Sequence, residues 1–333
     1  MSRPRPGPAL RLLLLLAALA VLCAFSIGIG TREVATGDIL SGLSGRLETI
    51  GQAAVAVRVP RTVLGLLAGA ALGLAGAVMQ GVTRNPLADP GILGVNTGAS
   101  LAVVVGIVWF GLASAEAHVW AAILGAAVAS AFVYAVGSLG RGGATPLKLT
   151  LAGAATSIAL SSIVVAVVLP RNDIAGGIRQ WQVGGIGGAT FDGIAGILPV
   201  LAAGFAVSLL SARKLNALAL GEELAAGLGE RVAAARAMAA LGAILLCGAT
   251  TAICGPIGFV GLVVPHLCRL LAGVDHRWLL PFSATAGAGL LLAADIVGRV
   301  VARPAEIDVG IVTALVGAPV FIWIVRRQKV RDL

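Results

Sequence analysis

The chain has 333 residues, of which 58% are hydrophobic and only 12% are charged. Its mean hydropathy of +1.00 lies far outside the usual range of soluble proteins and excludes an ordinary soluble domain. The formal net charge of +9 could suit a nucleic-acid partner, but no Lys/Arg run is interleaved with aromatic residues. We therefore attribute the positive charge to the loops of a membrane protein.

Long apolar runs predict an all-α polytopic membrane protein with about ten spans. A helix of about 20 apolar residues crosses a hydrocarbon core of roughly 30 Å. We expect residues 1–333 to form a single transmembrane domain. The predicted spans are residues 11–30, 62–82, 92–111, 118–138, 149–169, 193–211, 232–253, 256–272, 279–298 and 308–325.

The first apolar run follows Arg3, Arg5 and Arg11, as in a signal peptide. No small-x-small cleavage site follows it, which favours an uncleaved first span. With both termini in the cytoplasm, two thirds of the 24 lysines and arginines face inward, in accord with the positive-inside rule. This topology makes residues 170–192 extracytoplasmic and residues 211–231 cytoplasmic.

The stretch from Arg58 to Gly98 has unusual ends. It opens with Arg58-Val59-Pro60-Arg61 and breaks at Asn85-Pro86 before an apolar run resumes. Between these ends, small residues recur at every fourth position and form one smooth stripe that lets neighbouring helices approach closely. The stripe consists of Gly65, Gly69, Gly73, Ala77 and Gly81.

The segment 211–231 keeps Leu and Ala at helical spacing around glycine breaks. This pattern predicts two short amphipathic helices and favours a docking surface over an idle linker. In the segment 170–192, Trp181 is typical of the aromatic belt at a membrane surface.

No constellation for catalysis is found. The three lysines never follow a glycine, so the chain has no P-loop for ATP. The three histidines are scattered without a second ligand at metal-binding spacing, and the four cysteines lie in apolar runs. The sequence predicts neither an enzyme nor a bound cofactor or metal.

Few ionisable residues fall inside the predicted spans; His266 lies in the eighth span and Asp295 in the ninth. Such groups face a cavity or a partner, and a proton-driven transporter would use them as relays. One acid and one histidine without a chain of further groups favour structural pairing.

Arginines gather at the predicted outer ends of spans, at Arg58, Arg61, Arg299 and Arg303. They could anchor to lipid headgroups. The pair around Val59-Pro60 favours instead a stiff, strand-like entry that holds a carboxylate-bearing partner.

From about residue 55 onward the chain resembles the FecCD-type permease subunits of binding-protein-dependent ABC importers. The first half carries Arg58-Val-Pro-Arg61, Gly69-Ala-Ala-Leu-Gly, Gly76-Ala-Val-Met-Gln80 and Arg84-Asn-Pro-Leu-Ala-Asp-Pro-Gly-Ile-Leu-Gly-Val. The second half carries Gly255-Pro-Ile-Gly-Phe-Val-Gly-Leu-Val-Val-Pro-His266, Asp275-His-Arg, Ala294-Asp295, Glu306-Ile-Asp-Val-Gly310 and Gly317-Ala-Pro-Val-Phe321.

The resemblance implies a type II ABC importer permease fold in the bacterial inner membrane. It implies a second permease subunit, two cytoplasmic ATPase subunits that bind the ATP, and an extracytoplasmic binding protein that delivers iron–siderophore, haem or cobalamin. It also implies that the fifth and tenth spans line the pathway.

The resemblance further implies roles for particular residues. It assigns docking of the binding protein to Arg58, Arg61 and Arg299, and a cytoplasmic gate to Asn85 and Leu87. Coupling to the ATPase falls to Leu220, Gly221, Glu222, Glu223, Ala225, Leu228 and Gly229.

One position departs from the family pattern: Asp308 replaces the proline of Glu-Leu-Pro-Val-Gly, which puts contacts at the outer mouth in doubt. The end of the chain looks closest to ferric-siderophore members. The alternatives are a haem or cobalamin permease and, from another class, a proton-coupled secondary transporter. A homodimer and a heterodimer of permease subunits are equally compatible with the sequence.

Overall fold

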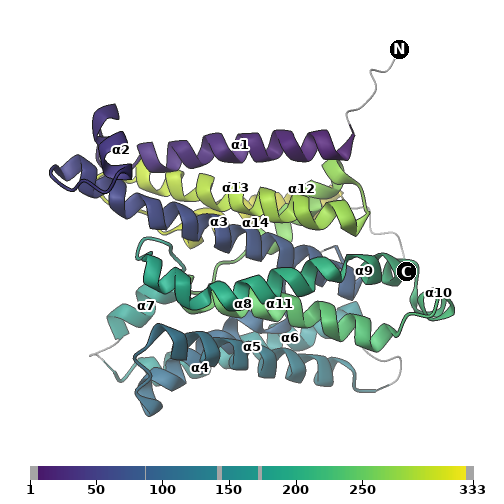
Figure 1. The fold of residues 1–333 in the computed structure, drawn as a ribbon. Helices are drawn as coiled ribbons and strands as arrows, with labels where there is room; N and C mark the ends of the chain where they lie inside the picture. The colour runs from purple at the N-terminus through teal and green to yellow at the C-terminus, as the bar shows by residue number, and fades with distance from the viewer. Residues whose placement is uncertain (1–6, 87, 141–144, 172–174, 328–333) are drawn as a thin grey trace.

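The computed structural model of the chain is a bundle of helices that run alongside one another (Figure 1). It describes residues 7–86, 88–140, 145–171 and 175–327, and within these ranges no strand occurs. The longer helices are α1 (Pro8–Gly28), α3 (Ile50–Thr83), α4 (Val95–Phe110), α5 (Ala115–Gly137), α6 (Pro146–Val168), α8 (Phe191–Leu210), α11 (Val232–Cys254), α12 (Val260–Ala272), α13 (His276–Val301) and α14 (Val309–Arg327). The short elements are α2 (Thr36–Leu43), η1 (Pro90–Leu93), α7 (Ala175–Val183), α9 (Ala212–Ala219) and α10 (Glu222–Gly227).

Each of the ten apolar runs predicted to span a membrane coincides with one of the longer helices. Seven of these helices are long and apolar enough to cross a membrane by length and composition. Three apolar helices are shorter: Val95–Phe110, Val260–Ala272 and Val309–Trp323. The all-α polytopic fold is therefore confirmed, while the number of crossings stays a prediction.

Helix α3 lies at the centre of the bundle and α1 at its edge (Figure 1). In the most apolar stretch of α3, 78% of the residues are buried, against 6% in α1. Helix α3 packs mainly against α13, α11 and α12. A residue near either end of α3 is therefore placed by several neighbouring helices at once.

The start of α3 differs from the expectation drawn from the sequence. The helix begins at Ile50 because Thr49 and Gln52 form a capping box, in which Thr49 Oγ1 accepts from the Gln52 backbone over 3.1 Å and Gln52 Oε1 accepts from Thr49 N. The predicted extended entry around Pro60 was wrong. The two arginines beside Pro60 project from a continuous helix.

The small-residue stripe of α3 lies against α13. A methyl group on Gly69 would come closer than 3.0 Å to the backbone of Gly287, and one on Gly73 would meet the carbonyl oxygen of Ser283. At the ends of the stripe, Gly65 faces Leu292 and Gly81 faces His276, while Ala77 is fully buried. The partners descend along α13 as the stripe ascends along α3, so the two helices run antiparallel in backbone contact.

The bundle has two distinct ends (Figure 1). Helices α2 and α7 lie at one end, which we call the α2–α7 end. Helices α9 and α10 lie at the other, together with the start of α1 and the end of α14, and we call it the α9–α10 end. The candidate site residues divide between these two ends.

Candidate functional site

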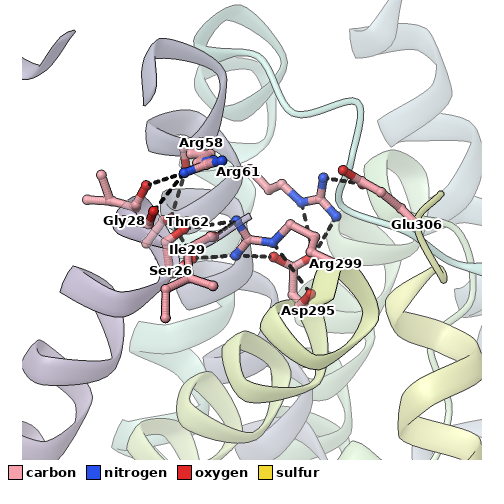
Figure 2. Close-up of polar contacts among 10 residues, drawn as sticks. Ser26, Gly28, Ile29, Arg58, Arg61, Thr62, Asp295, Arg299 and Glu306 are labelled. Atoms are coloured by element: carbon pink, nitrogen blue, oxygen red, sulfur yellow. Dashed lines mark hydrogen bonds and ion pairs between the residues drawn. The ribbon is translucent and has the colours of Figure 1, made fainter. Parts of the chain in front are cut away.

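An arginine cluster lies at the α2–α7 end, where α1, α3 and α13 meet (Figure 2). We use this name for Arg58, Arg61, Arg299 and Arg303 together with Asp295 and Glu306. The residues come from parts of the chain more than 230 positions apart, and the antiparallel packing of α3 on α13 brings them together. The cluster is the largest group of charges in the interior of the described bundle.

Asp295 is the buried centre of this cluster. Arg61 donates to Asp295 Oδ1 from Nε over 2.9 Å and from Nη2 over 2.8 Å. Arg299 Nη2 lies 2.9 Å from Asp295 Oδ2 in an ion pair without hydrogen-bond alignment. Arg61 Nη1 also donates to Glu306 over 2.6 Å, and that carboxylate is 40% exposed at its side chain. The predicted structural pairing is borne out for Asp295 by these contacts, whereas the buried Nδ1 of His266 has no hydrogen-bond partner among the described residues.

The remaining arginine donors satisfy the free carbonyl groups at the end of α1. The last carbonyls of a helix have no intrahelical partner and carry a partial negative charge, so cations stabilise that end. Arg58 donates to the carbonyls of Ile27 and Gly28 over 3.1 and 2.9 Å. Arg299 donates to those of Ser26 and Ile29, each over 2.9 Å. The two guanidinium groups thus tie α1, which is otherwise barely buried, to α3 and α13.

These contacts bear on the predicted docking role. Arg58, Arg61 and Arg299 are only 6%, 8% and 2% exposed, and each already binds groups of this chain. A partner protein could reach them only by displacing those groups. Docking of a binding protein by these three residues stays a prediction, and the charges of the cluster that face the surface are Glu306 and Arg303.

Sequence reasoning missed Ser26 and Glu306 as members of the cluster. Ser26 is the single buried residue of α1, and its hydroxyl accepts from Arg299 Nη2 over 3.0 Å. A lone serine in a leucine-rich span was the available signal. Nothing in its sequence context indicated which helix it would meet.

At the α9–α10 end, α3 stops in the predicted break. Arg84 closes the helix in the left-handed conformation, with φ of 53°. Asn85 follows, half-buried, and its carbonyl accepts from the Ala88 backbone over 3.1 Å. Leu87 lies outside the described residues. The gating role of Asn85 and Leu87 stays a prediction.

The segment 211–231 contains the two short helices that its pattern predicts. Gly221 and Gly229, with φ of 114° and 86°, bound α10 at its two ends. Ala225 is the buried residue of α10. In contrast, Leu220, Leu224 and Leu228 are 57%, 62% and 68% exposed. Glu223 is exposed, and Glu222 pairs with Arg236 over 2.7 Å. Helix α10 and the residues that flank it therefore present three leucines that no described part of the chain covers.

A polar link connects α9 to the start of α13. The Asn216 side-chain amide donates to Asp275 Oδ1 over 2.6 Å, and its oxygen accepts from the His276 backbone over 2.9 Å. The His276 ring lies 2.8 Å from the same oxygen and packs against Gly81 in the last turn of α3. Hydrogen bonds from the Arg277 backbone and from Asn216 lower the pKa of Asp275. One side chain thus joins α9, α13 and the last turn of α3.

Helix α6, the fifth predicted span, carries an exposed polar face. Ser157, Ser161 and Ser162 line a groove of 510 Å³ on the outside of this helix. Ser157 also meets Thr97 of α4 over 3.4 Å. The corresponding groove along α14 has a volume of 600 Å³ and is lined by apolar residues such as Ile311 and Leu315. Exposed serines on a membrane helix indicate a surface that does not face lipid.

Comparison with known proteins places this architecture in a family. Residues 18–327 match the model of the FecCD transport family. The ferric enterobactin transport system permease protein FepD of Escherichia coli (strain K12) is 46% identical over 323 residues, covering 96% of this chain and 95% of the relative. The relative named "Probable siderophore transport system permease protein YfiZ" in Bacillus subtilis (strain 168) is 43% identical over 81% of each chain.

A solved structure agrees with the fold. An inward-facing metal-chelate type ABC transporter superposes with a TM-score of 0.82 at 30% identity, covering 96% of this chain and all of the other. The fold and the apolar helices define a multi-pass membrane permease. The chain belongs to the FecCD transport family.

Proposed function

We propose that this chain is the membrane-spanning subunit of an ABC importer that moves ferric siderophore into the cell. The observation that carries the proposal is the 46% identity to the ferric enterobactin permease, which extends over nearly the whole of both chains. The siderophore permease of Bacillus subtilis supports the same cargo class. Haem and cobalamin permeases, at 41% and 40% identity, are the alternative within the class.

The energy would come from partner subunits, because the sequence has no P-loop. We assign the ATPase contact to α10 and its flanks. Three exposed leucines beside Glu222 and Glu223 provide the apolar centre and charged rim that are typical of a protein interface. With α10 in the cytoplasm, both termini are cytoplasmic, and the α2–α7 end faces the binding protein.

A second permease subunit, identical or paralogous, would complete the pathway. Exposed hydroxyl groups gain little free energy from contact with hydrocarbon. The face of α6 that carries the serines is therefore better suited to a partner subunit or a pathway than to lipid. We place the pathway along α6 and α14, where the two subunits would face each other.

Reconstitution tests the proposal. Proteoliposomes that contain the permease, its ATPase and its binding protein should accumulate ferric siderophore only when ATP is supplied. The chain alone under a proton gradient should accumulate none. Uptake by the chain alone, driven by the gradient, would establish the secondary transporter instead. Binding-protein affinities for ferric siderophore, haem and cobalamin then decide the cargo.

The coupling of ATP hydrolysis to transport gives a testable prediction at Asn216. Replacing it with alanine removes hydrogen bonds worth about 1–3 kcal/mol in a half-buried setting and leaves Asp275 with the Arg277 backbone as its donor. We expect Asn216→Ala to lower transport several-fold while the assembled complex still hydrolyses ATP. Lys214→Ala on the same helix removes only a partly exposed ion pair of 3.3 Å and serves as the control. Equal transport per ATP in both variants would contradict a coupling role.

A further inference from the structure

A groove at the α9–α10 end combines two cationic side chains with an apolar wall. It has a volume of 580 Å³ and lies between the end of α8, the start of α9 and the start of α13. Arg213 and Arg277 line it from α9 and α13, and Leu209, Leu210, Leu280 and Pro281 provide the apolar lining. None of the residue roles assigned above uses the guanidinium groups of Arg213 and Arg277 or this apolar lining.

The two arginines are available to a ligand. Both are exposed, and within the described ranges neither guanidinium pairs with a carboxylate. The acid nearest in sequence, Asp275, is held by Asn216 and by the Arg277 backbone. A guanidinium presents donors in a planar fork that suits the oxygens of a phosphate.

The position of the groove indicates the source of the phosphate. Helix α8 ends at Leu210 and α13 begins at His276, and both helices are long and apolar enough to cross a membrane. In a membrane that both helices cross, these ends would lie at the level of the lipid headgroups. Leu210, the last residue of α8, is 70% exposed and lines the groove together with Arg213. A ligand that fits both linings has a negatively charged head and a hydrocarbon tail.

We propose that this groove binds an anionic phospholipid of the leaflet at the α9–α10 end. The phosphate lies between Arg213 and Arg277, and an acyl chain covers Leu209, Leu210 and Pro281. Basic pockets between membrane helices are the sites where acidic lipids bind. The bound lipid would brace α9 against α13, beside the Asn216 link. The inference depends on the chain being a membrane protein and is independent of its cargo.

The test is native mass spectrometry of the purified full-length permease in detergent. The probes are phosphatidylglycerol, phosphatidylcholine with the same acyl chains, and inorganic phosphate. We expect preferential retention of phosphatidylglycerol, weakened about 5-fold by Arg213→Gln or Arg277→Gln and about 30-fold by both. Arg213→Lys should retain part of the binding, because the charge remains.

Arg231→Gln is the matched control, because Arg231 is exposed in the same segment and does not line the groove. Equal retention of both lipids, or an equal loss in the Arg231 variant, would overturn the site. Full competition by inorganic phosphate would show a soluble-anion site instead. Loss of the lipid on assembly with the ATPase would assign the groove to that protein interface and also refute the proposal.

Discussion

Asp295→Asn should destabilise the permease more than any other single change in the arginine cluster. The substitution preserves the shape of the side chain but leaves Arg61 and Arg299 facing each other without their shared carboxylate. Removing one partner of a buried ion pair costs about 3–5 kcal/mol, because the remaining charge stays desolvated. We expect a lower thermal midpoint and a smaller monodisperse fraction in detergent.

Two further variants isolate the cause. Glu306→Gln removes a carboxylate that is 40% exposed, so solvent screening should hold its cost to about 1 kcal/mol or less. Asp295→Asn combined with Arg299→Gln keeps the net charge of the cluster and leaves Arg61 paired with Glu306. We expect the double variant to recover part of the loss, although Ser26 and Ile29 would then lack their donor.

The same variant separates the two classes of transporter. In a proton-driven carrier, Asp295→Asn would abolish transport and leave the protein stable. In the arrangement observed here, the carboxylate holds helices together, so stability and transport should fall in parallel. A stable but inactive Asp295→Asn protein would contradict the structural role.

The sequence predicted the course of the chain better than its contacts. Length and hydropathy identify an apolar helix without reference to any other part of the chain, and each predicted run coincides with a helix. The start of α3 was misplaced because Arg58 and Pro60 suggested an extended entry. The capping box at Thr49, the stronger helix signal, lies eleven residues before Pro60.

The arginine cluster shows why site contacts escape sequence reasoning. Asp295 was expected to have a partner, and the arginines were expected near the outer end, but a docking role was assigned to them. Their acceptors are largely backbone carbonyls at the end of α1. Every residue has a backbone carbonyl, so the sequence does not indicate which ones will accept a hydrogen bond from a side chain. Only the packing of α1 beside α3 and α13 makes those carbonyls accessible to the guanidinium groups.

The glycine stripe of α3 was predicted only in part from the sequence. Its four-residue period predicted close packing, although it did not indicate which helix would be the neighbour. Helix α13 carries its own small residues, Ser283 and Gly287, at the same four-residue spacing. Two matching stripes are a stronger signal than one, and pairing them would have joined α3 to α13 from the sequence.

This backbone contact leads to the second large effect, at Gly69 and Gly73. An added methyl group would collide with backbone atoms of Gly287 and Ser283, which cannot rotate away as a side chain can. We expect Gly69→Ala or Gly73→Ala to push α3 away from α13 at a cost of about 1–3 kcal/mol each. The double variant should fail to give a monodisperse permease, because both helices also carry the arginine cluster.

Gly196→Ala on α8 is the matched control, because nothing lies within 4 Å of the position that its methyl group would occupy. Alanine favours a helix over glycine by about 1 kcal/mol, so this variant should be neutral or slightly more stable. The difference in thermal midpoint between Gly73→Ala and Gly196→Ala therefore reports the helix contact, with the propensity effect cancelled. Equal midpoints would mean that α3 and α13 are farther apart in the membrane than in the structure.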